Sequence, residues 1–161
     1  METSKLNKLA SSISKKYLND ELLIELKGYA KFFTKKGMIQ PETSGTFEDL
    51  MRLCSLAIDL QAVRERVVLI FLDIKSAKSR LKRLQKELFS GNKIASEYKK
   101  QSNKEQRELF AYKKGKSIEI ALDKARLFSE QCELILASID SHVWVLKNNS
   151  QVLSRAARTN D

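Results

Sequence analysis

Residues 53–88 read LCSLAIDLQAVRERVVLIFLDIKSAKSRLKRLQKEL, and this stretch decides the fold. Apolar residues recur along it three and four positions apart: Leu53, Leu56, Leu60, Val63, Val67, Ile70, Ile74, Ala77, Leu81, Leu84 and Leu88. Such a heptad repeat gives a helix one apolar seam that packs on other helices. At about 1.5 Å per residue, the seam is roughly 54 Å long. The pattern keeps its phase through residues 67–71, which favours a helix over a buried strand there.

Two shorter helices are predicted before this stretch. Residues 4–18 place leucine, alanine and isoleucine on one face and lysines mostly elsewhere, which is typical of an amphipathic helix. Asn19 is a suitable N-cap for a second helix over residues 20–36, because acidic residues follow it at the positive end of the helix dipole. Gly37 is expected to close this helix.

A break follows at residues 38–45, where IQPETSG combines proline, glycine and small polar residues. Thr46, with Asp49 three residues later, resembles a capping box and is expected to open the long helix. We therefore predict an N-terminal helical arm, residues 1–45, and a helical body, residues 46–161.

The long helix is expected to end at Ser90 and Gly91. We expect residues 93–100 to form a short, partly ordered stretch. Ser102, with Glu105 three residues later, repeats the capping pattern and predicts a new helix start.

The final helix, residues 117–158, is predicted to be the packing or oligomerisation helix, and Gly115 is expected to interrupt the chain before it only weakly. Apolar residues recur in it seven positions apart, with others beside them. The predicted core or oligomerisation residues are Cys132, Ile135, Leu136, Ile139, Val143, Leu146 and Leu153. The fold class is therefore all-α, an elongated helical hairpin or bundle. An internal hairpin and an intermolecular coil would bury the same seams.

Hydrophobic content of 42% with 31% charged residues is typical of a helix-rich soluble chain. No apolar run approaches the roughly 18 residues that cross a bilayer, and the N-terminus lacks the apolar core of a secretory signal. We expect a cytoplasmic protein that does not engage a membrane. Cys54 and Cys132, far apart in apolar helical runs, are expected to be small core residues.

No residue constellation indicates catalysis. The single histidine, His142, lies beside apolar residues in a helix, and no second histidine or cysteine cluster accompanies it to complete a metal site. The five glycines are scattered singly, which excludes a P-loop and a dinucleotide fingerprint. Most carboxylates lie at helical spacing from basic residues and suit solvated ion pairs. We expect no enzyme activity, cofactor or metal.

The basic segment, residues 71–116, carries 14 Lys and Arg against 5 Asp and Glu, a net +9 of the chain's +10. Cations at such spacing suit a phosphate backbone better than one small anion. The candidate nucleic-acid-binding residues are Lys75, Lys78, Arg80, Lys82, Arg83, Lys86, Lys99, Lys100, Lys104 and Lys113. Aromatic residues that could stack on bases are interleaved with them: Phe89, Tyr98, Phe110 and Tyr112.

A different class of function competes with this one. The chain could be a helical adaptor or assembly protein whose basic face is only a solvated surface or binds an acidic protein. The N-terminal arm, with aromatic residues beside lysines, could also dock on an acidic partner protein or an anionic membrane surface. Its net charge of about +3 favours packing onto the body over adsorption to a membrane.

Between residues 89 and 147 the chain resembles the phage UvsY-like recombination mediators. A helix ends in an aromatic-Ser-Gly turn at residues 89–91, and a polar basic stretch follows. The last helix then carries residues at the family's spacing: Cys132, Ile139, Ser141, Trp144, Leu146 and Lys147. The chain departs from the family in its extra N-terminal arm, in Leu88 and Phe89 where paired tyrosines are expected, and in His142 where an arginine is expected.

The resemblance implies a non-enzymatic protein that binds single-stranded DNA and forms a ring-like homo-oligomer. It also implies that the protein helps a RecA-like recombinase displace the single-strand-binding protein in the cytoplasm of an infected bacterial host. By the same analogy the cationic helix would lie along the strand, and the C-terminal helix would hold subunits together.

Overall fold

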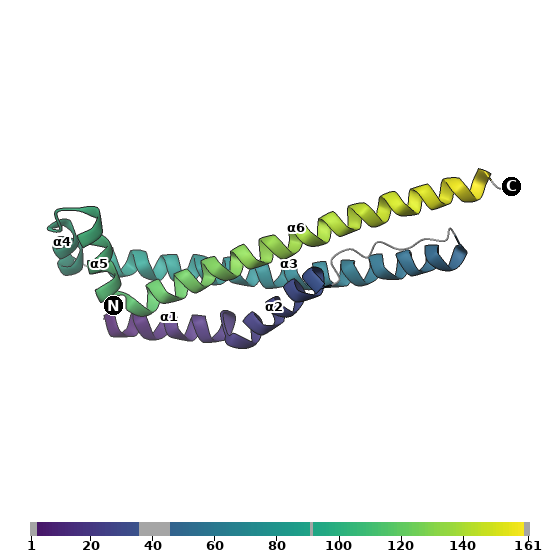
Figure 1. The fold of residues 1–161 in the computed structure, drawn as a ribbon. Coiled ribbons are helices and arrows are strands. Elements are labelled where there is room, and N and C mark those ends of the chain that lie inside the picture. Colours follow the sequence, from purple (N-terminus) through teal and green to yellow (C-terminus); the bar gives the residue numbers. More distant parts are fainter. Residues whose placement is uncertain (1–2, 36–45, 91, 160–161) are drawn as a thin grey trace. The chain divides into compact units, whose positions relative to one another are not determined.

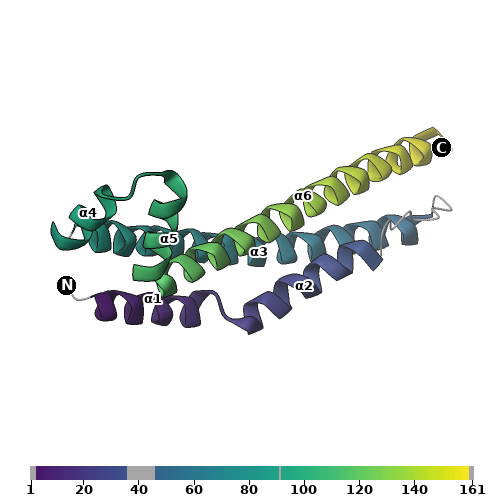
Figure 2. The ribbon, with the colours of Figure 1, turned by 60° about the vertical axis from the view of Figure 1, so that its left-hand side comes forward.

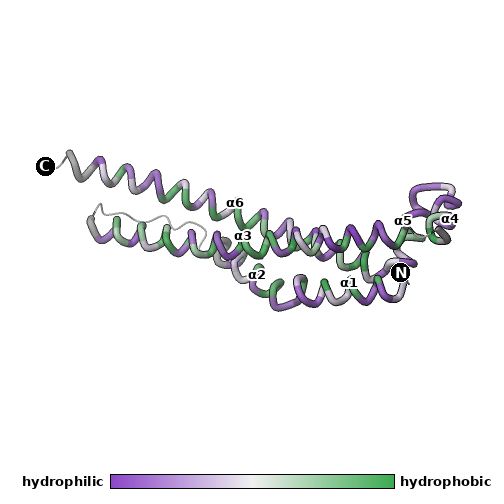
Figure 3. The backbone as a smooth tube through the Cα atoms, turned by 180° about the vertical axis from the view of Figure 1, so that it is seen from behind, coloured by the Kyte–Doolittle hydropathy of each residue, from purple (hydrophilic) through white to green (hydrophobic). Residues whose placement is uncertain are grey.

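The computed structural model describes residues 3–35, 46–90 and 92–159, and within these ranges it contains six α-helices and no strand (Figure 1). The helices are α1 (Thr3–Tyr17), α2 (Asp20–Lys35), α3 (Phe47–Ser90), α4 (Asn92–Lys99), α5 (Lys104–Lys114) and α6 (Lys116–Thr159). The all-α prediction is confirmed. Hydrophobic turns recur between hydrophilic ones along the two 44-residue helices, α3 and α6, as Figure 3 shows.

The caps predicted for α2 and α3 are present. The Leu22 N–H donates to Asn19 Oδ1 at 2.8 Å, which satisfies one of the unpaired amides in the first turn of α2. Thr46 and Asp49 bond reciprocally, backbone N–H to side-chain oxygen in both directions, at 3.3 Å each. Gly37 and the predicted break at residues 38–45 lie outside the described residues.

The chain between α3 and α6 differs from the prediction. Residues 93–100, expected to be partly ordered, belong mostly to the eight-residue helix α4. The N-cap of α5 is Asn103, whose Oδ1 accepts from Gln106 N at 2.8 Å, while the Ser102 hydroxyl bonds the Gln106 side chain instead. Gly115 separates α5 from α6, because the last turn of α5 closes on it with a 2.8 Å bond to the Ala111 carbonyl.

The chain divides into two compact units. Unit 1 contains residues Met1–Ile24 and Phe71–Glu130, and unit 2 contains residues Glu25–Ile70 and Gln131–Asp161. Both long helices contribute to both units. The predicted arm, residues 1–45, contributes residues 1–24 to unit 1 and the rest to unit 2, and its boundary at residue 45 stays a prediction.

In unit 1, α1 lies along α3 and α6 (Figures 1 and 2), and α6 runs antiparallel to α3. Apolar side chains from these helices form the core, including Leu6, Ile74, Leu81 and Ile118. Asn7 fixes α1 to the junction of α5 and α6. Its amide donates to the Lys114 carbonyl, and its Oδ1 accepts from the Ser117 N–H, both at 3.2 Å.

In unit 2, two ion pairs link the helices around a core that includes Leu53, Leu60 and Ile139. Arg66 on α3 bonds both carboxylate oxygens of Glu25 on α2, at 2.8 and 3.1 Å. The hydrogen bonds from the Arg66 guanidinium lower the pKa of Glu25. Partial burial opposes this shift, and a hydrogen bond from the Tyr29 hydroxyl adds to it. Arg64 on α3 pairs with Asp140 on α6 at 2.9 Å.

Both heptad seams are buried in the single folded chain. On α3, eight of the eleven predicted positions are at most 3% exposed, and Leu56, Val63 and Leu84 are half-buried. On α6, the seam residues Cys132, Ile135, Ile139 and Leu146 are buried, and Leu136 and Val143 are half-buried. The side chain of Leu153 lies outside the described residues. In this structure the buried seam residues therefore pack against other parts of the same chain.

The two cysteines occupy different environments. Cys132 is fully buried, and burial raises the pKa of its thiol to about 11. Cys54 is exposed, so its predicted core position is wrong. It follows the buried Leu53 by one residue, and one step along a helix turns the side chain by about 100° out of the seam.

Candidate nucleic-acid interface

Charge is divided very unevenly between the two units. Unit 1 contains 20 Lys and Arg residues and 11 Asp and Glu residues, a formal charge of +9. Unit 2 contains 10 Lys and Arg residues and 9 Asp and Glu residues, a formal charge of +1. All ten predicted nucleic-acid-binding residues belong to unit 1. Any electrostatic attraction to a polyanion therefore originates almost entirely in one compact unit.

The second half of α3 supplies a lysine stripe, defined as Lys75, Lys78, Lys82 and Lys86. These positions are three or four residues apart and therefore share one flank of the helix, beside the buried seam of Ile74 and Leu81. Three of the four are exposed, and Lys78 is half-buried. The Lys75 ammonium lies 4.2 Å from the centroid of the Phe71 ring, which holds the stripe's first member against α3.

The two predicted arginines of α3 lie away from the lysine stripe. Arg80 packs its guanidinium 5.7 Å from the centroid of the Tyr17 ring on α1, and Lys16 lies 5.1 Å from the same ring. Arg83 is exposed. The cations of α3 are therefore spread over more than one flank of the helix, and part of them face α1.

The remaining predicted cations lie between α4 and the end of α5. Lys99, Lys100, Lys104 and Lys113 are all exposed. Lys104 pairs with Glu108 at 3.8 Å on the same helix. Nearby, Lys114 pairs with Glu97 at 3.4 Å and so joins α5 to α4.

Few of the predicted cations are neutralised within the protein. Among the described residues, Lys104 is the one member of the ten that forms an ion pair, and that pair is long and exposed. An exposed pair of this kind contributes about 0 to 1 kcal/mol and yields readily to another anion. Of the other nine, eight are exposed and Lys78 is half-buried.

The aromatic residues of this segment divide into two groups. Phe89, Tyr98 and Phe110 are half-buried and in contact, with centroids 5.1 Å apart for Phe89 and Tyr98 and 6.3 Å apart for Tyr98 and Phe110. They hold α4 and α5 against the end of α3. Tyr112 is 44% exposed and is the member of the predicted set whose ring is most open to solvent.

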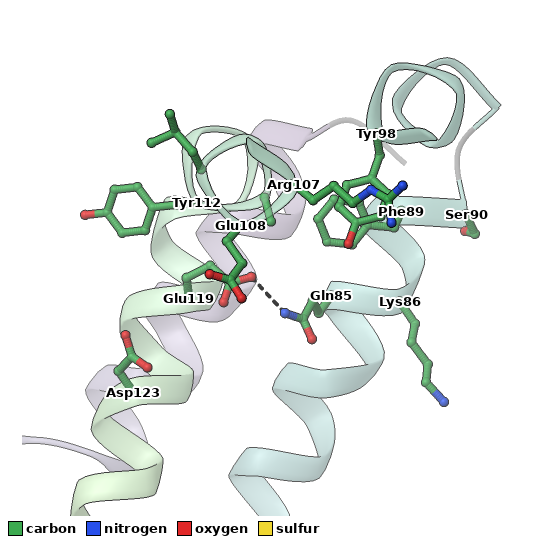
Figure 4. Close-up of a pocket in the computed structure, with 12 residues that line it drawn as sticks. Gln85, Lys86, Phe89, Ser90, Tyr98, Arg107, Glu108, Tyr112, Glu119 and Asp123 are labelled. Carbon is green, nitrogen blue, oxygen red and sulfur yellow. Dashed lines mark hydrogen bonds between the residues drawn. The ribbon is translucent and has the colours of Figure 1, made fainter. Parts of the chain in front are cut away.

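A cavity of about 840 Å³ lies in unit 1 beside these rings (Figure 4). Its lining residues come from the end of α3, from α4 and α5, and from the start of α6: Gln85, Lys86, Phe89, Ser90, Tyr98, Arg107, Glu108, Leu109, Ala111, Tyr112, Glu119 and Asp123. Gln85 donates to Glu119 at 2.8 Å across it. The carboxylates of α6 were missed in the sequence, because only the antiparallel return of α6 brings residues 119 and 123 beside residue 85.

The described residues offer no conspicuous site for other chemistry. No group of three or more His, Cys, Asp and Glu residues in the described ranges is placed to hold a metal ion. His142 Nδ1 lies 2.7 Å from the Ser138 carbonyl oxygen, one turn earlier in α6. None of the described helices combines the length and the apolar character needed to cross a membrane.

Comparisons of the chain with protein families, with curated proteins and with solved structures find no match.

Proposed function

We propose that this chain is a non-enzymatic protein that binds single-stranded DNA through unit 1. The observation that supports this most strongly is the segregation of charge, +9 on unit 1 against +1 on unit 2. Nine of the ten cations chosen from the sequence are exposed, and one of the ten forms an ion pair among the described residues. Such cations gain free energy by displacing the counterions condensed on a phosphate backbone.

A single strand suits this surface better than a duplex. The lysine stripe provides cations at repeated intervals along α3, and α5 adds an exposed aromatic ring at Tyr112. Unpaired bases can stack on such a ring, contributing about 1 to 3 kcal/mol per base, whereas a duplex keeps its bases stacked on one another.

The mediator role is the more specific part of the proposal and rests on the resemblance to the UvsY-like family. In this role the chain, as a homo-oligomer, helps a RecA-like recombinase replace the single-strand-binding protein on DNA. A protein with this role needs affinity for the strand and for other proteins, and it needs no catalytic centre.

The binding proposal is tested by removing three exposed lysines of the stripe together, as Lys75→Ala, Lys82→Ala and Lys86→Ala. We expect affinity for a labelled oligo-dT at 0.1 M salt to fall at least about tenfold, because each lost phosphate contact removes counterion release. Fluorescence anisotropy measures the Kd. The matched control removes three exposed cations of unit 2, Lys27→Ala, Arg52→Ala and Lys147→Ala, and should change the Kd by less than about threefold. Equal losses in both variants would contradict the assignment to unit 1.

A second candidate function is a helical adaptor that binds another protein. Exposed large apolar side chains on the part of α6 that belongs to unit 2 favour it: Leu134 is 70% exposed, Trp144 66% and Val152 64%. Absence of binding to single-stranded DNA at low salt would support the adaptor and reject the DNA-binding proposal.

A further inference from the structure

We propose that the cavity in unit 1 receives one base of the bound strand and prefers a base that carries an exocyclic amine, such as cytosine, over thymine. This inference rests on the proposed binding of single-stranded DNA and adds a base preference to it.

Flat and apolar side chains form one part of the cavity wall. Phe89 and Tyr98 line it with their rings 5.1 Å apart, and they belong to the contact cluster that fixes α4 and α5. Leu109 and Tyr112, one turn apart on α5, line it as well and remain 54% and 44% exposed. A planar ring that covers these side chains would remove apolar surface from water and stack on an aromatic face.

Carboxylates form another part of the wall, as Figure 4 shows for Glu108, Glu119 and Asp123. Glu119 accepts one hydrogen bond, from Gln85 to Oε1, which orients its carboxylate and leaves Oε2 unbonded among the described residues. Asp123, one turn later on α6, is exposed and interacts electrostatically with Arg126. An ionised carboxylate accepts hydrogen bonds and donates none, so these oxygens can accept from donor groups of a ligand.

The charge of the wall selects the part of the nucleotide that enters. Three carboxylates line the cavity and repel a phosphate group, although Glu108 pairs with Lys104. Lys86, a member of the lysine stripe, and Arg107 also line the cavity and attract a phosphate group. The backbone is therefore expected to follow the lysines while the base enters the cavity. Cytosine presents an N4 amine that can donate to a carboxylate, and thymine presents the O4 acceptor at the equivalent position.

The cavity has room for a base. A volume of about 840 Å³ lies within the range of about 300 to 1,000 Å³ that is usual for small-molecule pockets. Two aromatic walls with a few placed polar groups are the features by which single-stranded bases are commonly recognised.

The test compares labelled oligo-dC with oligo-dT of equal length at one salt concentration, because both are pyrimidine strands with the same backbone charge. We expect the wild-type protein to bind oligo-dC about tenfold more tightly, the lower end of the discrimination given by paired base contacts. In the double variant Glu119→Ala, Asp123→Ala the ratio should fall to about one, although both strands can bind more tightly once two negative charges are gone. Far-UV circular dichroism and the urea midpoint check that the variant is folded.

The matched control is Glu87→Ala, Glu105→Ala, which removes the same charge from exposed positions of unit 1 that do not line the cavity. It should raise affinity for both strands and leave the ratio of the two affinities unchanged.

The ratio of affinities for oligo-dC and oligo-dT decides the inference. A wild-type ratio of one, or a preference for oligo-dC that persists in the cavity variant, would overturn this inference and leave the binding proposal intact. A third outcome is that the wild-type protein binds both strands equally and binds an arginine-rich peptide, and that the cavity variant no longer binds the peptide. This outcome would assign the cavity to a cationic side chain and would also overturn the inference. Failure to bind either strand would reject the binding proposal itself.

Discussion

Gly115 lies between α5 and α6 in unit 1, at a point where the Leu88 side chain occupies the space that a Cβ atom would need. A Cβ atom there would lie 2.8 Å from Leu88 Cδ2 and 3.4 Å from the Ala111 carbonyl oxygen. Leu88 is 2% exposed, so its methyl group cannot move aside without disturbing the core. Gly28, in the middle of α2, has nothing within 4 Å of the equivalent position.

These two glycines should respond to alanine with opposite signs. Gly115→Ala should lower the free energy of unfolding by about 1 to 3 kcal/mol, because it overpacks the contact with Leu88. Gly28→Ala should raise it by up to about 1 kcal/mol, since alanine is the better helix former at an open site. Urea unfolding followed by circular dichroism measures both. Two changes of the same sign would contradict the packing described for Gly115.

At the scale of the helix, the seam of α6 offers a matched pair of substitutions in unit 2. Ile139→Asp should lower the free energy of unfolding by several kcal/mol, because Ile139 is fully buried and an unpaired carboxylate loses its hydration there. Leu134→Asp should change it by about 0.5 kcal/mol or less, because Leu134 is 70% exposed on the same helix. Urea midpoints and slopes provide the comparison. Equal destabilisation by the two substitutions would show that the seam does not separate a buried from an exposed face.

The helices that could be predicted are those in which an apolar repeat continues over many turns or in which a capping residue marks the start. Eleven seam positions fix the phase of α3 over many turns, and the Asn19 and Thr46 caps each have a partner three residues away. Helix α4 was missed because eight residues are too few to establish a period, and the glycine before it suggests a stop. The N-cap at Asn103 was assigned one residue too early, because Ser102 is an equally suitable capping residue type.

The tertiary part of the candidate site lay beyond sequence reasoning. The cationic segment is visible as a local excess of lysine and arginine. In contrast, the hydrogen bonds of Asn7 to Lys114 and Ser117 join residues more than 100 positions apart. No local sequence pattern predicts such contacts. The carboxylates of the cavity come from α6, and their position opposite Gln85 depends on how the two long helices pair in register.

At the scale of the whole molecule, the two compact units share two long helices and differ in charge. Unit 2 is nearly neutral and carries exposed apolar residues on α6, whereas unit 1 carries almost all of the net charge together with the cavity. In the proposed mediator role, we expect unit 1 to bind the strand and unit 2 to contact other proteins.

The central claim, that unit 1 binds the backbone of single-stranded DNA, is tested most directly by the slope of log Kobs against log salt concentration. Each phosphate contact on a single strand contributes about −0.7 to this slope. We predict a steep negative slope for the wild-type protein that becomes shallower by about 2 when Lys75, Lys82 and Lys86 are replaced by alanine. The slope should be unchanged when Lys27, Arg52 and Lys147 of unit 2 are replaced. A slope near zero, or one that the lysine-stripe variant shares with the wild-type protein, would contradict the account.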